Sequence, residues 1–168
     1  MIPPLPFRIG HGYDAHRFVP GRALVLGGVT IEHDRGLDGH SDADVLTHAV
    51  IDALLGAMAI GDLGTHFPSS DARWKDASSL DLLKRARTMV EDAGGRVAQV
   101  DTVVYLERPH IAEHVARMRS ELARVLDVSI ERVSVKATTT DTMGFVGAGE
   151  GAAASAIALV AVGMKEGN

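Results

Sequence analysis

The sequence contains no cysteine, few aromatic residues and no long apolar run. Without cysteine, neither a disulfide framework nor a thiolate zinc site can form, and His, Asp and Glu remain as the strong metal ligands. An aromatic content of 4% and a net charge of −5 argue against a nucleic-acid binder. An anionic substrate would therefore need local positive charge from metal ions or backbone amides.

The length fits a single domain spanning residues 1–168, because one hydrophobic core commonly serves about 100–200 residues. Residues 1–6 have neither the basic start nor the apolar core of a signal peptide, and we expect them to form a flexible N-terminal extension. No apolar run approaches the roughly 18 residues of a membrane span. These features favour a cytoplasmic protein.

Strand and helix patterns alternate along the chain. The sequence predicts strands over 7–12, 97–107 and 133–138, a hairpin over 23–31 that turns at Gly27-Gly28, and helices over 42–60, 79–93 and 111–126. Residues 152–162 fit two structures, since their alanines favour a helix and their β-branched residues a strand. This order indicates an α/β or α+β fold in two layers.

Asp14 and His16 form the first candidate metal-binding pair. Residues two apart in an extended segment point to the same face, so the two side chains would project together. A carboxylate and an imidazole are two of the three protein ligands that a catalytic zinc needs. Two solvated residues in a loop give the same pattern, and the glycines nearby are typical of turns.

The helix predicted after residue 42 is apolar on almost every side, yet Asp44, His48 and Asp52 follow one another at intervals of four. Burying a charged group without partners is costly, so this polar stripe needs a metal, a ligand or a hydrogen-bond network. It could equally be a helix edge that faces water. With Asp14 and His16, His48 would complete a zinc site with one open position for catalysis.

Three further segments have the character of a phosphate or nucleotide site. They are the tight turn GDLG at 61–64, the run KATTTD at 136–141 that follows a strand, and the glycine-rich GFVGAGEG at 144–151. The last is neither a Walker sequence nor a dinucleotide-binding fingerprint. Each segment taken alone could be a simple turn.

Taken together, these motifs resemble one known family. RIGHGYDAH at 8–16, HSDADV at 40–45 with His48, GDLG at 61–64, KATTT at 136–140 and GFVGAGEG at 144–151 occur in the order found in the 2-C-methyl-D-erythritol 2,4-cyclodiphosphate synthases. The resemblance implies an α+β two-layer sandwich, with one mixed sheet, helices on one face, and 152–162 as a strand. It also implies a homotrimer with active sites between neighbouring subunits.

The same resemblance implies a reaction. The substrate would be 4-diphosphocytidyl-2-C-methyl-D-erythritol 2-phosphate, whose 2-phosphate attacks the β-phosphorus of its diphosphate and expels CMP. Such a transfer needs positioning and charge neutralisation rather than a protein nucleophile. Zn²⁺, or another divalent transition metal, would be held by Asp14, His16 and His48. Mg²⁺ or Mn²⁺ would bind with the substrate diphosphate, with Asp141 as the carboxylate for it.

The remaining site residues also follow from the resemblance. His40 and Thr139 are expected to have catalytic roles. The residues expected to bind substrate are Ser41, Asp62, Gly64, Phe67, Asp71, Leu106, Pro109, His110, Thr138, Thr139 and Phe145. No nucleic-acid or membrane partner is expected.

The sequence departs from the family pattern at several positions. Asp141 stands where Glu is usual and is one methylene shorter. His110 stands where Lys is common, so a phosphate contact there would be weaker or pH-dependent. Ala148 replaces an Arg that, in many bacterial members, faces a cavity on the three-fold axis and binds an isoprenoid diphosphate. Without that guanidinium, bidentate recognition of a phosphate is lost.

Two other functions use the same residues. A metal-dependent phosphoester hydrolase could be built on Asp14, His16 and His48 with His40 and Asp44, and would release CMP without a cyclic product. A trimeric metal or ligand carrier would bind zinc and turn over no cytidine diphosphate substrate.

Overall fold

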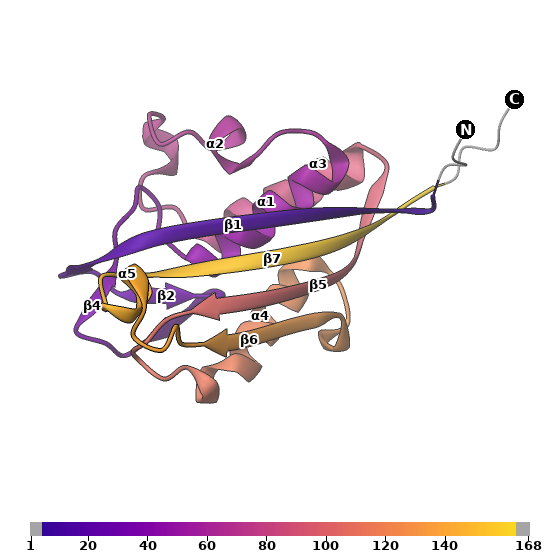
Figure 1. The fold of residues 1–168 in the computed structure, drawn as a ribbon. Helices are drawn as coiled ribbons and strands as arrows, with labels where there is room; N and C mark the ends of the chain where they lie inside the picture. The colour runs from indigo at the N-terminus through magenta and orange to yellow at the C-terminus, as the bar shows by residue number, and fades with distance from the viewer. Residues whose placement is uncertain (1–4, 164–168) are drawn as a thin grey trace, which may run out of the picture.

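The first and last strands lie side by side in the middle of the main sheet (Figure 1). In the computed structural model, which describes residues 5–163, β1 (Phe7–Pro20) runs antiparallel to β7 (Gly151–Val162). The sheet has the order β4-β1-β7-β5-β6 and includes β4 (Arg35–Leu37), β5 (Gly95–Tyr105) and β6 (Val133–Thr138). Strands β5 and β6 are parallel, so the sheet is mixed, as expected.

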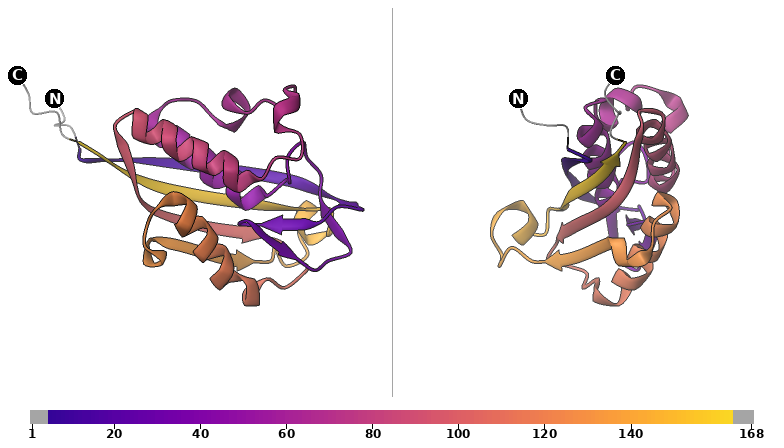
Figure 2. Two further views of the ribbon diagram at one scale, coloured as in Figure 1. Left: turned by 180° about the vertical axis from the view of Figure 1, so that it is seen from behind. Right: turned by 90° about the vertical axis from the view of Figure 1, so that its right-hand side faces the viewer.

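Three long helices cover one face of this sheet (Figure 2). They are α1 (Val45–Met58), α3 (Ser79–Asp92) and α4 (Val115–Leu126). A separate hairpin of β2 (Leu24–Leu26) and β3 (Val29–Ile31) lies on the same side. The short elements are α2 (Leu63–His66), α5 (Gly144–Gly147) and three 3-10 turns, Ala72–Trp74, Ala112–His114 and Ile130–Arg132.

Most predicted helices and strands are present, but several of them begin or end at residues other than those predicted. The strand expected at 7–12 continues to Pro20, and residues 151–162 form a strand rather than a helix. Helix α1 ends at Met58 because Ala59 adopts a left-handed conformation, so Gly61 is not its terminator. The expected hairpin turns at Gly27 and Gly28, both at positive φ, as a two-residue turn requires.

Two glycines of β1 let α1 pack directly against the sheet. A Cβ on Gly10 would lie 1.9 Å from the Ala53 carbonyl oxygen, and one on Gly12 would lie 2.0 Å from that of Ala49. Both glycines are inside a strand, so the expectation of turn glycines is wrong here. Only a residue without a side chain allows two backbones to approach so closely. This contact sets the distance between β1 and α1.

The described residues include no helix long and apolar enough to cross a membrane. Of the extension expected at 1–6, residues 1–4 lie outside the described part of the chain. The Pro6 carbonyl accepts a hydrogen bond from the Val162 backbone N–H, so the β1–β7 pairing extends to that residue.

Candidate metal centre and substrate cavities

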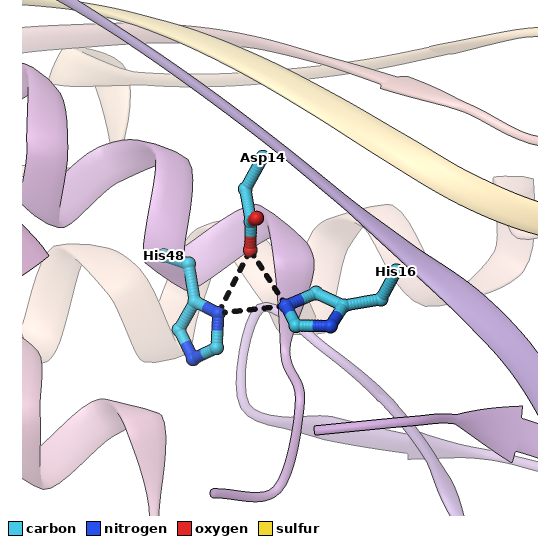
Figure 3. A group of neighbouring side chains, drawn as sticks. All are labelled: Asp14, His16 and His48. Carbon is cyan, nitrogen blue, oxygen red and sulfur yellow. Dashed lines mark hydrogen bonds and ion pairs between the residues drawn. The ribbon is translucent and has the colours of Figure 1, made fainter. Parts of the chain in front are cut away.

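Asp14, His16 and His48 converge on one point between β1 and α1 (Figure 3). The Asp14 Oδ2 atom is 2.8 Å from His16 Nε2 and 2.8 Å from His48 Nδ1. The two ring nitrogens are 3.3 Å apart. This is a carboxylate oxygen and two imidazole nitrogens in the spacing that a single metal ion would accept, and it is the set predicted from the sequence.

The secondary structure explains why these three side chains meet. Gly12, Asp14 and His16 alternate along β1 and share the face that packs on α1. His48 lies in the first turn of α1 and is 4% exposed. Because Gly12 brings β1 against Ala49, the neighbouring His48 ring reaches the carboxylate of Asp14 directly.

The outward nitrogens of both imidazoles have hydrogen-bond partners in the protein. His16 Nδ1 lies 2.5 Å from the Asp38 carbonyl oxygen, which can only accept, so Nδ1 carries the hydrogen. His48 Nε2 lies 2.9 Å from Ser79 Oγ and 3.1 Å from Ser41 Oγ. This arrangement, with one ring nitrogen bonded to the protein and the other directed at a shared point, is the one that metal-ligating histidines show.

The charges of the three groups reinforce one another. Burial alone would raise the pKa of Asp14, but hydrogen bonds from His16 and His48 hold this pKa well below its usual range. Burial would also lower the pKa of His16, yet its hydrogen bond and ion pair with Asp14 raise the pKa above 6.5. The site therefore has an ionised carboxylate beside a proton-binding imidazole, and a cation can replace that proton.

The three residues of the polar stripe expected along α1, Asp44, His48 and Asp52, have separate roles. Asp44 is fully buried and accepts hydrogen bonds from the Gly27 and Gly28 backbone N–H groups and from Thr47. Asp52 accepts from the Leu63 backbone N–H. Asp44 thus fixes the β2–β3 turn and caps α1, so its expected place in a hydrolase site is wrong.

A cavity of about 180 Å³ opens beside the three side chains. His40, Ser41 and Phe67, all expected at the site, line it, together with Leu63, Ser69, Trp74 and Leu82. His40 is oriented by a contact of 3.1 Å between its Nε2 and the Asp71 carbonyl oxygen. The carboxylate of Asp71 is occupied by Arg73, and the pKa of Asp71 is lowered by that hydrogen bond.

Asp62 and Gly64 lie at the start of α2, next to the Leu63 that lines this cavity. The Asp62 carboxylate accepts hydrogen bonds from the Thr65 backbone N–H and hydroxyl, both at 2.7 Å, which lower the pKa of Asp62. The tight turn predicted at 61–64 is therefore a short capped helix at the rim of the cavity.

A second cavity of about 200 Å³ contains the other group of expected substrate residues. Leu106, Pro109, His110, Thr138 and Thr139 line it, with Ile111, Ala112 and Ala137. None of these residues lines the first cavity, beside Asp14, His16 and His48, which we call the metal cavity. His110 Nε2 contacts Arg108 Nη1, so the ring accepts from a guanidinium, which brings the positive charge of Arg108 to the position where Lys is common in the family.

Asp141 and Phe145 lie apart from both groups. Asp141 is exposed and left-handed, with φ 51°, in the loop after β6, and it is not among the three converging candidate metal ligands. Phe145 lines a surface hollow of about 250 Å³ with Ala15, His16, Arg17 and Glu150. Phe145 therefore shares a hollow with one candidate metal ligand, His16, but it does not line the cavity that contains Ser41.

Sequence reasoning missed three residues that organise the site. Ser79 reaches His48 from the start of α3, and Asp42, which precedes α1, holds Ser79. No local pattern indicates contacts across 31 and 37 positions. Glu107 follows β5 and accepts from the Thr140 backbone N–H at 3.0 Å and the Thr142 N–H at 3.3 Å. Its place at the end of the predicted strand 97–107, where ligand-binding loops often begin, was a usable signal.

Comparison with known proteins identifies relatives across nearly the whole chain. Residues 7–161 match the model of the YgbB family. The 2-C-methyl-D-erythritol 2,4-cyclodiphosphate synthase of Salinibacter ruber is 60% identical over 149 residues, which cover 89% of this chain and 95% of that protein.

Solved structures agree with this match. A 2C-methyl-D-erythritol-2,4-cyclodiphosphate synthase with bound CDP superposes with a TM-score of 0.84 and 35% identity, over 91% of this chain and 99% of that one. The bifunctional IspDF of Campylobacter jejuni gives a TM-score of 0.91 and 38% identity over 96% of this chain. This chain spans 44% of the length of that bifunctional protein.

Proposed function

The chain belongs to the YgbB family, and we infer that it catalyses the reaction of the 2-C-methyl-D-erythritol 2,4-cyclodiphosphate synthases to which it is similar. The substrate is 4-diphosphocytidyl-2-C-methyl-D-erythritol 2-phosphate. A 2-phosphate oxygen forms a bond to the β-phosphorus, and the bond from that phosphorus to the CMP oxygen breaks. The products are the cyclic diphosphate and CMP, so the enzyme is a cyclising phosphorus–oxygen lyase of isoprenoid precursor synthesis, placed in the cytoplasm.

The observation that carries this proposal is the convergence of Asp14, His16 and His48 at the edge of a cavity. Two neutral imidazoles and one carboxylate suit zinc or another divalent transition metal, and they leave an open coordination position. The hydrogen bonds to the outward nitrogens of His16 and His48 fit that role, because they leave the inward nitrogens free to coordinate.

When bound there, zinc supplies Lewis-acid polarisation of a phosphate oxygen beside the attacked phosphorus. The protein residues position the reacting groups. His40 and Ser41 present hydrogen-bonding groups to the cavity, and we assign them to the phosphates and the methylerythritol part. Leu63 and Phe67 offer apolar surface that excludes water, the competing nucleophile. Asp62, Gly64 and Asp71, which lie next to or contact residues that line this cavity, are also assigned to substrate binding.

We assign the second divalent ion, Mg²⁺ or Mn²⁺, to the substrate diphosphate, with Asp141 as the nearby carboxylate. The loop carrying Asp141 joins the second cavity through Thr138 and Thr139. A hard cation of this kind prefers carboxylate, phosphate and water oxygens, all of which this exposed loop can admit. Thr139 is proposed to have a catalytic role, and Phe145 is proposed to bind substrate.

The cytidine is proposed to occupy the cavity between Leu106 and Thr139. That cavity shares no lining residue with the metal cavity of the same chain. A substrate that carries both a nucleotide and a reacting diphosphate therefore needs two half-sites brought together. We propose that a neighbouring subunit of a homotrimer supplies one half, which is the reason for active sites between subunits.

The uncovered face of the sheet supports this assembly. Ile9 and Tyr13 on β1 and Ile157 on β7 are 64%, 52% and 51% exposed, and they point away from the helices. A cluster of large apolar side chains on one open face favours protein association. Sedimentation equilibrium tests the trimer directly, and a monomer at micromolar concentration would contradict it.

The decisive experiment is incubation with the cytidylated substrate and Mg²⁺ or Mn²⁺, followed by phosphorus NMR. We expect the two coupled resonances of a cyclic diphosphate and an equimolar amount of CMP. CMP with an acyclic diphosphate would instead establish a hydrolase. Full zinc occupancy with no turnover would establish a metal carrier.

A further inference from the structure

His48 makes opposite contacts through its two ring nitrogens. Nδ1 faces Asp14 Oδ2 at 2.8 Å and His16 Nε2 at 3.3 Å. Nε2 faces the hydroxyl oxygens of Ser79 at 2.9 Å and Ser41 at 3.1 Å. A neutral imidazole carries one hydrogen, so the partner on the Nε2 side decides whether Nδ1 keeps its lone pair for a metal.

The contacts of Ser79 fix the direction of its hydroxyl hydrogen. Its hydroxyl contacts Asp42 Oδ1, and its backbone N–H donates to Asp42 Oδ2 at 2.9 Å. The Ser79 hydroxyl has one hydrogen, which goes to a carboxylate that can only accept. The remaining lone pairs of Ser79 Oγ must therefore accept from His48, which places a ring hydrogen on Nε2 and leaves Nδ1, on the Asp14 side, as the nitrogen that a metal would bind.

Ser41 is less constrained than Ser79. Its oxygen accepts from the Ala43 backbone N–H at 3.2 Å, and its side chain lines the metal cavity. No acceptor fixes the Ser41 hydroxyl hydrogen among the contacts of the described residues, so it can turn toward a phosphate. Ser79, in contrast, is completely buried and does not line the cavity.

We propose that Asp42 and Ser79 are positioning residues that hold His48 in its Nε2–H form, with Nδ1 available to the metal and the Ser41 hydroxyl available to substrate. This inference rests on the metal role of His48 in the proposed function. A hydrogen bond from the protein to the outer nitrogen of a metal-binding histidine typically contributes roughly 10- to 100-fold to metal affinity.

The same contact also starts helix α3. Ser78 is the N-cap residue of α3 but makes no side-chain capping bond. The Asp42 carboxylate instead accepts from the Ser79 N–H, at the helix end where a negative charge is favourable. The docking of α3 and the orientation of His48 therefore depend on one carboxylate, although His48 and Ser79 are 31 positions apart.

The test measures zinc affinity without substrate, by competition with a chromogenic chelator. We expect Ser79→Ala to bind zinc roughly 10- to 100-fold more weakly than the unmodified protein. Asp42→Asn should lose less, because its amide oxygen can still accept one of the two bonds. Ser78→Ala is the matched control and should bind as the unmodified protein does. Ser79→Thr restores the hydroxyl and should recover affinity.

A spectroscopic signature separates positioning from general loss of structure. In the metal-free protein, long-range ¹H–¹⁵N correlation spectra of labelled histidine should show a hydrogen on His48 Nε2, and the population of this Nε2–H form should be smaller in Ser79→Ala. Backbone spectra confirm that the variant is folded. An unchanged tautomer together with zinc affinity within twofold would overturn the proposal.

The two measurements also distinguish this inference from the proposed function. If the unmodified protein shows the Nε2–H tautomer but binds no zinc, the metal assignment fails while the role of Ser79 stands. If it binds zinc and Ser79→Ala binds equally well, the metal assignment stands and the positioning role is refuted.

Discussion

Gly12 of β1 lies against Ala49 of α1 so closely that a Cβ on Gly12 would come within 2.0 Å of the Ala49 carbonyl oxygen. Asp14, two residues further along β1, and His48, the residue before Ala49, are joined by a contact of 2.8 Å. The absence of one side chain therefore sets the distance across which a metal would be held.

Gly12→Ala should destabilise the protein and weaken zinc binding together. The clash is with backbone rather than with a flexible side chain, so we expect a loss of at least about 2 kcal/mol in the free energy of unfolding. Urea denaturation of the metal-free protein measures it. Gly56→Ala in α1 is the control, since its Cβ would meet only the His11 oxygen at 3.9 Å. That change should stabilise the helix by about 0.5–1 kcal/mol.

His48→Ala should abolish stoichiometric zinc binding while the protein stays folded. Two remaining ligands cannot hold zinc tightly, because a catalytic site normally uses three. Metal analysis after dialysis gives the stoichiometry, and circular dichroism reports the fold. His114→Ala is the control, since His114 pairs with the exposed Glu113. Full zinc content in the His48 variant would remove that residue from the ligand set.

The stability of the metal-free protein should fall as the pH rises above 6.5. Asp14 raises the pKa of His16 in the folded state, so protonated His16 contributes stability that is complete below its ordinary pKa of 6.5. That contribution is lost as the pH passes through the higher folded-state pKa. Urea denaturation from pH 6 to 9 should show the decline.

Zinc must displace the proton from His16, so apparent zinc affinity should rise over the same interval. In Asp14→Asn the extra pH dependence of stability should be absent, because the group that raises the pKa of His16 has lost its charge. A variant with the same slope as the unmodified protein would assign the proton to another group.

We expect Glu107 to support activity through the carboxylate oxygen that accepts hydrogen bonds from the loop after β6. It holds Thr140 and Thr142 in a loop where Asp141 and Thr142 both have positive φ, at 51° and 64°. Such conformations cost about 1–3 kcal/mol each and persist only when the surroundings enforce them.

Glu107→Ala should therefore lower kcat/KM by roughly 10-fold or more, which corresponds to about 1.4 kcal/mol of lost positioning. Glu107→Gln retains an acceptor oxygen and should keep most of the activity, and steady-state kinetics compare the two. Equal losses in both variants would show that the charge of Glu107, rather than its hydrogen bonds, is required.

Because residue 148 is alanine, we expect weak or absent binding of geranyl or farnesyl diphosphate. The residue is exposed at the end of α5, and its methyl group offers nothing to a phosphate, while Glu150 nearby would repel one. Ala148→Arg should introduce binding through charge-assisted hydrogen bonds. Titration calorimetry compares the two forms, and tight binding by the unmodified protein would show that other groups replace the guanidinium.

The sequence predicted the elements of this fold better than their limits. Alternating residues and the Gly27-Gly28 turn identify strands and hairpin because these are local properties. The extent of β1 was not predictable in this way, since residues beyond Gly12 are held by pairing with the distant β7. The alanines of β7 favour a helix by propensity, and burial between β1 and β5 overrides that preference.

The candidate metal ligands were accessible from the sequence because two of them are neighbours on one strand and the third is a lone imidazole on a buried helix. Asp44 and Asp52 looked equivalent to His48 on that helix, but only the tertiary structure shows that backbone amides already occupy them. The contact of Ser79 with His48 depends on how α3 docks, which no local pattern encodes.

The central place of β7 has a consequence for how the chain is made. Among the described strands it is the last to leave the ribosome, yet it joins β1 to β5. Until then, β1 with β4 and β5 with β6 are two separate pieces, each with an unpaired edge. During translation these two edges therefore stay open to other nascent chains until β7 is inserted. The time needed to complete and release the chain, rather than the rate of early folding, sets how long the edges are exposed.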